Sequence, residues 1–143
     1  MNLQAPPITE DFVHTFFGHV DQHNFDVVEV MLDPECTITA PGFTQVGASY
    51  VCLWMAGFFA AFPDLRHHPR RILIDGRDVA FELTVTGTHT ADLSLPDGTV
   101  VSPTGRRLEL VLAEFWSLED GLVKDYTVHY DNHDFLVQLG LVT

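Results

Sequence analysis

The sequence predicts an α+β fold in which helices cover one face of an antiparallel sheet. Apolar residues recur with helical spacing in the first half of the chain and alternate with polar residues in the second half. Strong turn signals, Asp75-Gly76 and Asp120-Gly121, separate the alternating segments in the manner of hairpins. A length of 143 residues suits a single domain, residues 1–143, with a sizeable buried core.

The first half of the chain is predicted to form three helices and one strand. Thr9 precedes two acidic residues and an apolar series at four-residue spacing, which is typical of a helix start. Asn24 is a candidate cap for a second, short helix that stops before a proline. The predicted elements are a helix after Thr9, a helix at 26–32, a strand at 36–40, a turn at Pro41-Gly42 and a largely buried helix at 46–62.

The second half is predicted to form four strands and a final helix. Its strands are expected at 70–74, 79–89, 108–118 and 122–130. The polar connection at 92–107 contains the turn signals Pro96-Asp97-Gly98 and Pro103-Thr104-Gly105, and is expected to form a small hairpin or a mobile lid. Asp131 is a candidate N-cap for a helix that runs to Leu139, and Gly140 is a candidate C-cap.

One carboxylate interrupts an apolar strand face. Alternation along 108–118 places Glu114 among leucines and Trp116, on the face expected to contact the helices. Loss of hydration there would disfavour the charged form and raise the pKa of Glu114, which suits a general acid or base near neutral pH. Two alternatives to a functional role remain. Glu114 is an ordinary buried polar group with its hydrogen bonds satisfied, or the strand has a register that turns Glu114 to solvent.

Neighbouring strands place further polar side chains on the same side. We expect His89, Tyr126 and Tyr130 to share a cavity with Glu114, with His89 and Tyr126 as candidate catalytic residues beside it. A buried histidine is more commonly a hydrogen-bonded core residue. A functional role for His89 is therefore expected only if His89 lies close to Glu114. The expected apolar and aromatic lining consists of Trp54, Met55, Phe16, Leu112, Trp116, Val128 and Tyr130.

Composition and motifs exclude several functional classes. A net charge of −13 disfavours binding to nucleic acid or to an anionic membrane surface, and no apolar run is long enough to span a bilayer. The N-terminal segment lacks the features of a secretory signal, so we expect a cytoplasmic protein. Cys36 and Cys52 are expected to be buried reduced thiols. The sequence contains no Walker or dinucleotide motif. We interpret His67-His68 as the exposed start of a strand, and the residues of 129–134 do not clearly converge on a metal, so we expect no cofactor.

The opposite sheet face is predicted to be only half polar. Val111, Phe115 and Val123 alternate there with charged and polar residues. Because a semi-apolar outer face often becomes a subunit interface, we expect a homodimer formed through this face.

Several segments together resemble the SnoaL-like polyketide cyclases of the nuclear transport factor 2-like superfamily. They are residues 58–65 (FFAAFPDL), 86–90 (TGTHT), 103–107 (PTGRR), 119–121 (EDG) and 135–140 (FLVQLG), in an order and spacing that cover the chain from Phe12. The resemblance implies a cone-shaped curved sheet, similar to cystatin-like α+β folds, with helices closing an apolar pocket. It also implies a dimer and cofactor-free intramolecular aldol chemistry.

The resemblance also indicates where this chain departs from the cyclases. The family's catalytic aspartate falls on Val128, and an assisting histidine falls on Glu114. Another family aspartate falls on Asp131, so the resemblance implies that Asp131 is a further candidate catalytic residue. We therefore expect either cyclisation or isomerisation of a polyketide- or terpenoid-like small molecule with Glu114 as the acid–base group, or a non-catalytic homologue that binds such a molecule. An epoxide hydrolase-like activity ranks lower, because Tyr126 and Val128 supply no second carboxylate on their strand.

Overall fold

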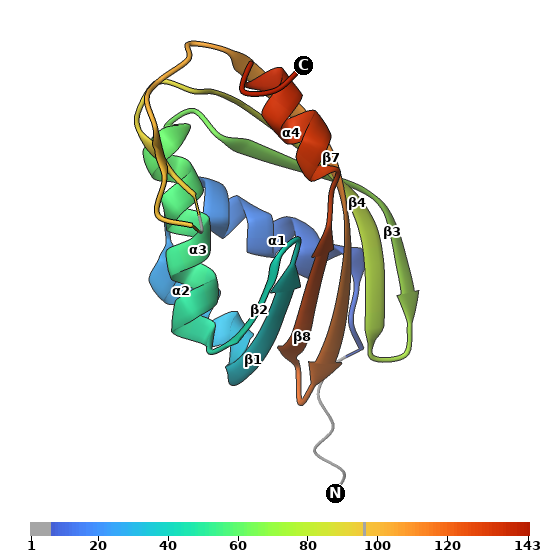
Figure 1. The fold of residues 1–143 in the computed structure, drawn as a ribbon. Coiled ribbons are helices and arrows are strands. Elements are labelled where there is room, and N and C mark those ends of the chain that lie inside the picture. Colours follow the sequence, from blue (N-terminus) through green and yellow to red (C-terminus); the bar gives the residue numbers. More distant parts are fainter. Residues whose placement is uncertain (1–6, 96) are drawn as a thin grey trace, which may run out of the picture.

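The chain folds into a strongly curved six-stranded sheet with helices on its concave side (Figure 1). This computed structural model describes residues 7–95 and 97–143. Residues 1–6 of the N-terminal segment, and Pro96 of the predicted Pro96-Asp97-Gly98 turn, lie outside the described part. The α+β class and the curved sheet with helices closing an apolar interior are confirmed.

Four helices and eight strands make up the described fold. The helices are α1 (Glu10–Asp21), α2 (Phe25–Met31), α3 (Ala48–Ala61) and α4 (Asn132–Gln138). The strands are β1 (Leu32–Ala40), β2 (Phe43–Val46), β3 (Arg66–Asp75), β4 (Asp78–Thr88), β5 (Leu93–Ser94), β6 (Val100–Val101), β7 (Arg107–Glu119) and β8 (Leu122–His129). Among these helices, none is long and apolar enough to cross a membrane.

The main sheet has the strand order β2-β1-β8-β7-β4-β3. All neighbouring strands are antiparallel except β1 and β8, which are parallel. β5 and β6 form a separate small hairpin, the first of the two conformations expected for 92–107. Figure 1 shows this hairpin beside α3, where α3 and β5 are in contact, while α4 packs on β7 near the far end of the sheet.

In the first half of the chain, the structure differs from the predicted strands in two places. β1 begins at Leu32, ahead of the predicted start, because an irregularity between Leu32 and Thr37 in its pairing with β8 accommodates Pro34. β2 was not predicted, since its four residues are too few to establish an alternation. Val46, which was expected to begin the third helix, is instead the last residue of β2.

The face assignments hold for β4 and β7 but only partly for β8. Every second residue of β4 and β7 is buried, as predicted, so Glu114 is on the inner face. In β8 the pairing moves from Ser117–Asp125 to Leu118–Val123, which leaves Lys124 as an extra residue. This bulge turns Val123 inward, where it is fully buried, so its predicted position on the outer face is wrong.

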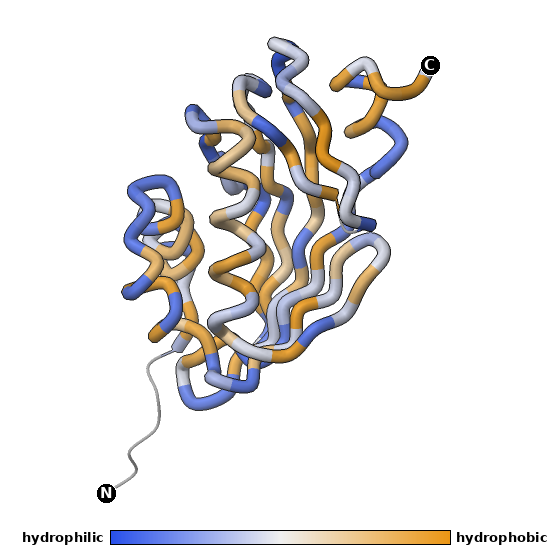
Figure 2. The backbone as a smooth tube through the Cα atoms, turned by 60° about the vertical axis from the view of Figure 1, so that its left-hand side comes forward, coloured by the Kyte–Doolittle hydropathy of each residue, from blue (hydrophilic) through white to orange (hydrophobic). Residues whose placement is uncertain are grey.

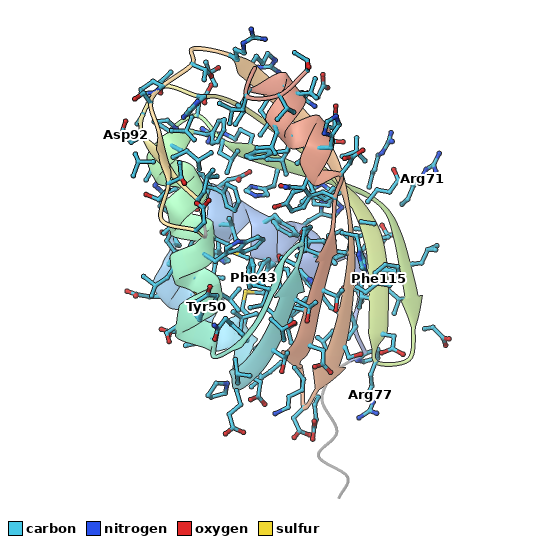
Figure 3. All side chains as sticks on the ribbon, viewed as in Figure 1. Phe43, Tyr50, Arg71, Arg77, Asp92 and Phe115 are labelled. Atoms are coloured by element: carbon cyan, nitrogen blue, oxygen red, sulfur yellow. The ribbon has the colours of Figure 1, made fainter. Side chains whose placement is uncertain are left out.

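Helix α3 packs against the sheet with one side only. Val51, Met55 and Phe59 are buried, while Leu53 is 71% exposed, so the prediction of a largely buried helix holds for one face. Figure 2 shows hydrophobic residues along much of α3 and the strands, with hydrophilic residues gathered at several turns. In Figure 3, side chains fill the space between α3 and the sheet. The rings of Phe43 and Tyr50 pack edge to face there, with centroids 6.1 Å apart.

Of the three residues predicted at helix starts, only Asp131 makes a side-chain cap hydrogen bond. The Asp131 carboxylate accepts a hydrogen bond from the backbone N–H of Asp134 at 3.0 Å, which is an N-cap on α4. Thr9 and Asn24 precede their helices but make no side-chain cap hydrogen bond. Gly140 follows α4 with a φ of 76°, the left-handed conformation expected after a helix end.

Candidate functional site

The candidate site is a cavity between the concave face of the sheet and the helices. Its volume is about 60 Å³, room for a few water molecules. The walls are almost entirely apolar and aromatic, and the polar lining groups are Glu114, Tyr126, Tyr130, His67 and the Trp54 indole. Trp54, Phe58 and Tyr130 are only half buried, so they line the side of the cavity nearest solvent.

Glu114 is the carboxylic acid of this cavity. It lies in the middle of β7, pairs with Phe81 of β4 and Val128 of β8, and is 2% exposed. Burial raises the pKa of Glu114 from its ordinary 4.5 to about 8, and hydrogen bonds from Tyr126 and Trp116 lower it by less. At neutral pH the side chain is therefore mostly a neutral acid that can donate a proton.

Two aromatic side chains orient that acid. The indole N–H of Trp116 donates to Oε1 of Glu114 at 3.2 Å, from two residues along the same strand face. The hydroxyl of Tyr126, on the neighbouring strand, hydrogen-bonds the same carboxyl group. Burial and the nearby Glu114 raise the pKa of Tyr126 well above its ordinary value, so its hydroxyl keeps its proton. The result is a small polar centre on an otherwise apolar wall.

The predicted lining residues divide into two groups. Trp54, Met55, Leu112 and Tyr130 line the cavity together with Glu114 and Tyr126. The other predicted residues, Phe16, Trp116 and Val128, are fully buried behind the lining. Phe16 packs edge to face on Trp116 with ring centroids 4.8 Å apart, and so supports the residue that holds Glu114.

His89 does not meet Glu114, contrary to the expectation from strand faces. The cross-strand partner of Glu114 in β4 is Phe81, and His89 is eight residues further along, roughly 26 Å at the rise of an extended strand. Instead, His89 anchors the segment before β7. Its Nδ1 accepts a hydrogen bond from the backbone N–H of Thr104 at 3.2 Å and lies 3.0 Å from the Thr104 hydroxyl.

Asp131 also lies away from the cavity. Its side chain is exposed, is absent from the cavity lining, and caps α4. The capping prediction is therefore confirmed, whereas the structure does not bring Asp131, a candidate catalytic residue by resemblance, to the cavity that Glu114 lines. Position after the last predicted strand favours a cap and the resemblance favours a catalytic role, and only the turn of the chain after His129 decides between them.

A histidine–aspartate pair at the cavity was missed. His67, interpreted above as the exposed start of a strand, has a side chain only 11% exposed and lines the cavity. Its Nδ1 is 2.6 Å from Oδ1 of Asp21, and its backbone N–H donates to Oδ2 of Asp21 at 3.1 Å. Alternation along β3 separates inward-facing His67 from exposed His68, but nothing in the sequence pairs His67 with a residue 46 positions earlier.

Other potential ligands are dispersed. In residues 7–95 and 97–143, no three His, Cys, Asp or Glu side chains converge on a point that could hold a metal ion. Cys36 and Cys52 are buried free thiols, and burial raises their pKa values to about 12 and about 11. Both thiols therefore stay protonated, so neither is an activated nucleophile.

This fold and this acid-bearing apolar cavity place the chain in a known class. The chain belongs to the SnoaL-like domain family, which it matches over residues 13–126. This finding confirms the resemblance on which the cone-shaped fold was predicted. No curated protein matches the chain by sequence.

Solved structures of similar proteins share the fold over nearly the whole chain. AclR, a proposed hydroxylase from Streptomyces galilaeus, has a TM-score of 0.77 and 25% identity, covering 94% of this chain and 96% of AclR. A proposed SnoaL-like polyketide cyclase from Jannaschia sp. CCS1 has a TM-score of 0.79 and 18% identity, covering 99% and 100%. IdmH, a proposed polyketide cyclase from Streptomyces antibioticus, has a TM-score of 0.76 and 21% identity, covering 91% and 96%.

Proposed function

We propose that the protein cyclises or isomerises a largely apolar small molecule, polyketide- or terpenoid-like, by acid–base chemistry that uses its own side chains. The observation that carries this proposal is Glu114, a buried carboxylic acid in an apolar cavity with a pKa of about 8. A neutral acid of this kind both binds a carbonyl oxygen and donates a proton to it as negative charge develops.

The surroundings of Glu114 define its role. Because Trp116 donates to Oε1, the proton of the neutral acid is available from Oε2. The Tyr126 hydroxyl, which also keeps its proton, donates to this carboxyl group and holds it in place. A protonated carboxylic acid next to a tyrosine hydroxyl is a known arrangement for stabilising an enolate or alkoxide oxygen in an apolar site.

The cavity walls indicate the substrate class. Leucine, valine and aromatic side chains make up most of the lining, so binding energy comes chiefly from burial of apolar surface. A cavity of about 60 Å³ does not hold a fused-ring molecule, so side chains must move apart to admit one. We propose that the substrate enters between Trp54 and the segment 92–107, where half-buried aromatic side chains lie nearest to solvent.

A non-catalytic binding protein is the second candidate. The observation that favours it is Val128, a hydrocarbon side chain that pairs directly with Glu114 at the position where the resemblance puts the family's catalytic aspartate. In this version Glu114 and Tyr126 only hold a carbonyl or hydroxyl group of the ligand.

We further propose that the protein forms a homodimer through the outer sheet face. Val111 and Phe115 of β7 are each 52% exposed on this face, and Leu73 of β3 is 70% exposed. Figure 3 shows Phe115 on the sheet, away from the helices that cover the inner side. Exposed apolar side chains on one sheet face support an interface there.

The Glu114→Gln variant tests the proposed function. The probe is an aryl-substituted linear diketone whose aldol closure to a cyclic β-hydroxy ketone consumes the aryl carbonyl group, and the reaction is followed by the loss of aryl ketone absorbance. We expect wild-type protein to accelerate ring closure, and Glu114→Gln to lower kcat/KM about 10²–10⁴-fold while binding of the probe changes little. Glu109→Gln, an exposed change on the same strand, is the matched control.

The alternatives give different results in the same experiment. Equal turnover by Glu114→Gln and wild-type protein would remove Glu114 from the chemistry. Saturable binding of the probe without any turnover, weakened by Glu114→Gln, would establish the binding protein instead.

A further inference from the structure

We propose that His67, oriented by Asp21, is the base that removes a proton from carbon, while Glu114 protonates the oxygen at the other end of the reaction. This inference rests on the proposed function and completes it, since a neutral acid alone cannot start a carbon–carbon bond-forming step. It assigns Glu114 the donor role only, and gives proton removal to a group on the opposite part of the cavity lining.

The contacts of His67 leave one ring nitrogen free for this role. Oδ1 of Asp21 lies 2.6 Å from Nδ1, so Nδ1 carries a hydrogen that it donates to the carboxylate. Oδ2 of the same carboxylate accepts the backbone N–H of His67 at 3.1 Å. Because Nδ1 is the donor, the lone pair of the neutral ring is on Nε2, and no hydrogen bond among the described residues uses Nε2.

Packing holds the imidazole in this orientation. Its ring stacks on Phe17 with centroids 5.3 Å apart and an interplanar angle of 21°, and lies 6.0 Å from the ring of Phe59. The side chain is 11% exposed and lines the cavity. A base whose ring plane and tautomer are both fixed needs little rearrangement when substrate binds.

The sheet register separates the base from the acid by a defined amount. His67 of β3 pairs with Val85 of β4, whereas Glu114 of β7 pairs with Phe81, four residues away along β4. In a flat sheet this offset, two strands across and four residues along, corresponds to roughly 16 Å between Cα atoms. The two side chains project onto the concave face, so their functional ends are closer together than this.

With an acid and a base on two different strands of the same concave face, a substrate bound between them can undergo an intramolecular aldol closure. Nε2 of His67 takes a proton from carbon beside one carbonyl group, and the electron pair of the broken C–H bond forms the new carbon–carbon bond to a second carbonyl carbon. The π pair of that second carbonyl moves to its oxygen, which receives the proton from Glu114. Release of the proton from His67 to water and uptake of a proton from water by the Glu114 carboxylate restore the resting state.

Hydrogen exchange at carbon separates the base from the acid experimentally. The probe is the same aryl diketone in deuterated buffer, with α-hydrogen exchange followed by proton NMR and ring closure followed by absorbance. We expect His67→Gln to lower both rates by about 10²-fold or more. We expect Glu114→Gln to lower ring closure by that amount but to keep most of the exchange. His68→Gln, a change at the exposed neighbour, should leave both rates unchanged.

The failures of the two proposals are distinguishable. Exchange at the wild-type rate in His67→Gln, or exchange by wild-type protein no faster than in buffer, overturns His67 as the base. Wild-type exchange that depends on His67 but leads to no ring closure overturns the proposed cyclisation and leaves the base in place. Exchange that is lost in Glu114→Gln and kept in His67→Gln makes Glu114 the base.

Asp21 is a positioning residue and has a separate readout. Nitrogen NMR of labelled histidine should show a hydrogen on Nδ1 of His67 in the wild-type protein, and Asp21→Asn should remove this preference. We expect Asp21→Asn to lower the exchange rate less than His67→Gln does. If Asp21 only fastens α1 to β3, Asp21→Asn lowers stability while the exchange rate of the folded protein and the Nδ1 hydrogen are unchanged, and this result overturns the dyad.

Discussion

The buried acid Glu114 makes protein stability depend on pH in a predictable direction. In the unfolded chain its pKa is near the ordinary 4.5, and in the folded protein burial raises the pKa to about 8. Between these two values the folded state binds more protons than the unfolded state, so the free energy of unfolding falls as pH rises. The contribution is fully present below the unfolded pKa and is lost as pH rises through about 8.

The size of this effect follows from the shift. One pKa unit corresponds to about 1.4 kcal/mol, so the full titration of Glu114 is worth roughly 5 kcal/mol. This is an upper limit, because local opening of the cavity can hydrate the carboxylate before the whole protein unfolds. Even half of it is a large part of the roughly 5–15 kcal/mol that stabilises a typical domain.

Urea denaturation of wild-type protein and Glu114→Gln across this pH range measures the effect. The amide is isosteric and neutral at every pH, so in the difference between the two curves the titration of all other groups cancels. We expect wild-type protein to lose stability relative to Glu114→Gln by several kcal/mol as pH rises from about 5 to about 9. Glu109→Gln, at an exposed position of the same strand, should show no comparable trend.

A flat difference curve would refute the reasoning. If the two proteins differ by the same free energy within about 1 kcal/mol at all pH values, Glu114 titrates equally in folded and unfolded states. The carboxyl group would then be ionised at neutral pH, and its role as proton donor would be withdrawn.

Two further expectations concern the outer sheet face and α4. Wild-type protein should sediment as a dimer at micromolar concentration, and the Phe115→Asp variant should sediment as a monomer. The control is Leu53→Asp, which places a charge on the exposed side of α3 and should leave the dimer intact. A wild-type species of 16.0 kDa would contradict the interface. Asp131→Ala should lower the free energy of unfolding by about 1 kcal/mol through loss of its cap, measured by urea denaturation, without changing turnover of the diketone. A turnover loss of more than about ten-fold would return Asp131 to the catalytic group.

The inner face of the sheet could be predicted because strand alternation has a strict period of two. In β7 the series Leu108, Leu110, Leu112 indicates the inner face, and Glu114 follows on this face, as the burial pattern of the strand confirms. The same rule failed in β8, where the bulge at Lys124 adds one residue and exchanges the faces on its N-terminal side. A bulge is set by the fit between two neighbouring strands, so a single strand sequence does not reveal it.

The rest of the site could not be predicted from the sequence, because it depends on distances along the strands and on contacts between segments far apart in the chain. His89 is on the predicted face of the β4 ladder but far from Glu114, because sharing a face says nothing about distance along it. His67 meets Asp21 only after α1 packs across β3, a contact between segments 46 residues apart. Strand alternation with a period of two and helical spacing of about four residues carry no information on contacts between such distant segments.

Glu114 and Val128 together explain how a SnoaL-like chain can keep an acid in its cavity without the family's aspartate. The two residues are direct cross-strand partners on the inner face, and side chains of such partners start only about 5 Å apart. The resemblance puts the family's catalytic aspartate at Val128 and its assisting histidine at Glu114. By this resemblance, the acid of this chain lies one strand across from the position of the family's aspartate. The only cavity-lining imidazole in the described part of the chain is His67 of β3. In the proposed mechanism the acid is therefore on β7 and the base on β3, and the hydrogen-exchange experiment on His67→Gln and Glu114→Gln decides between a catalyst and a binding protein.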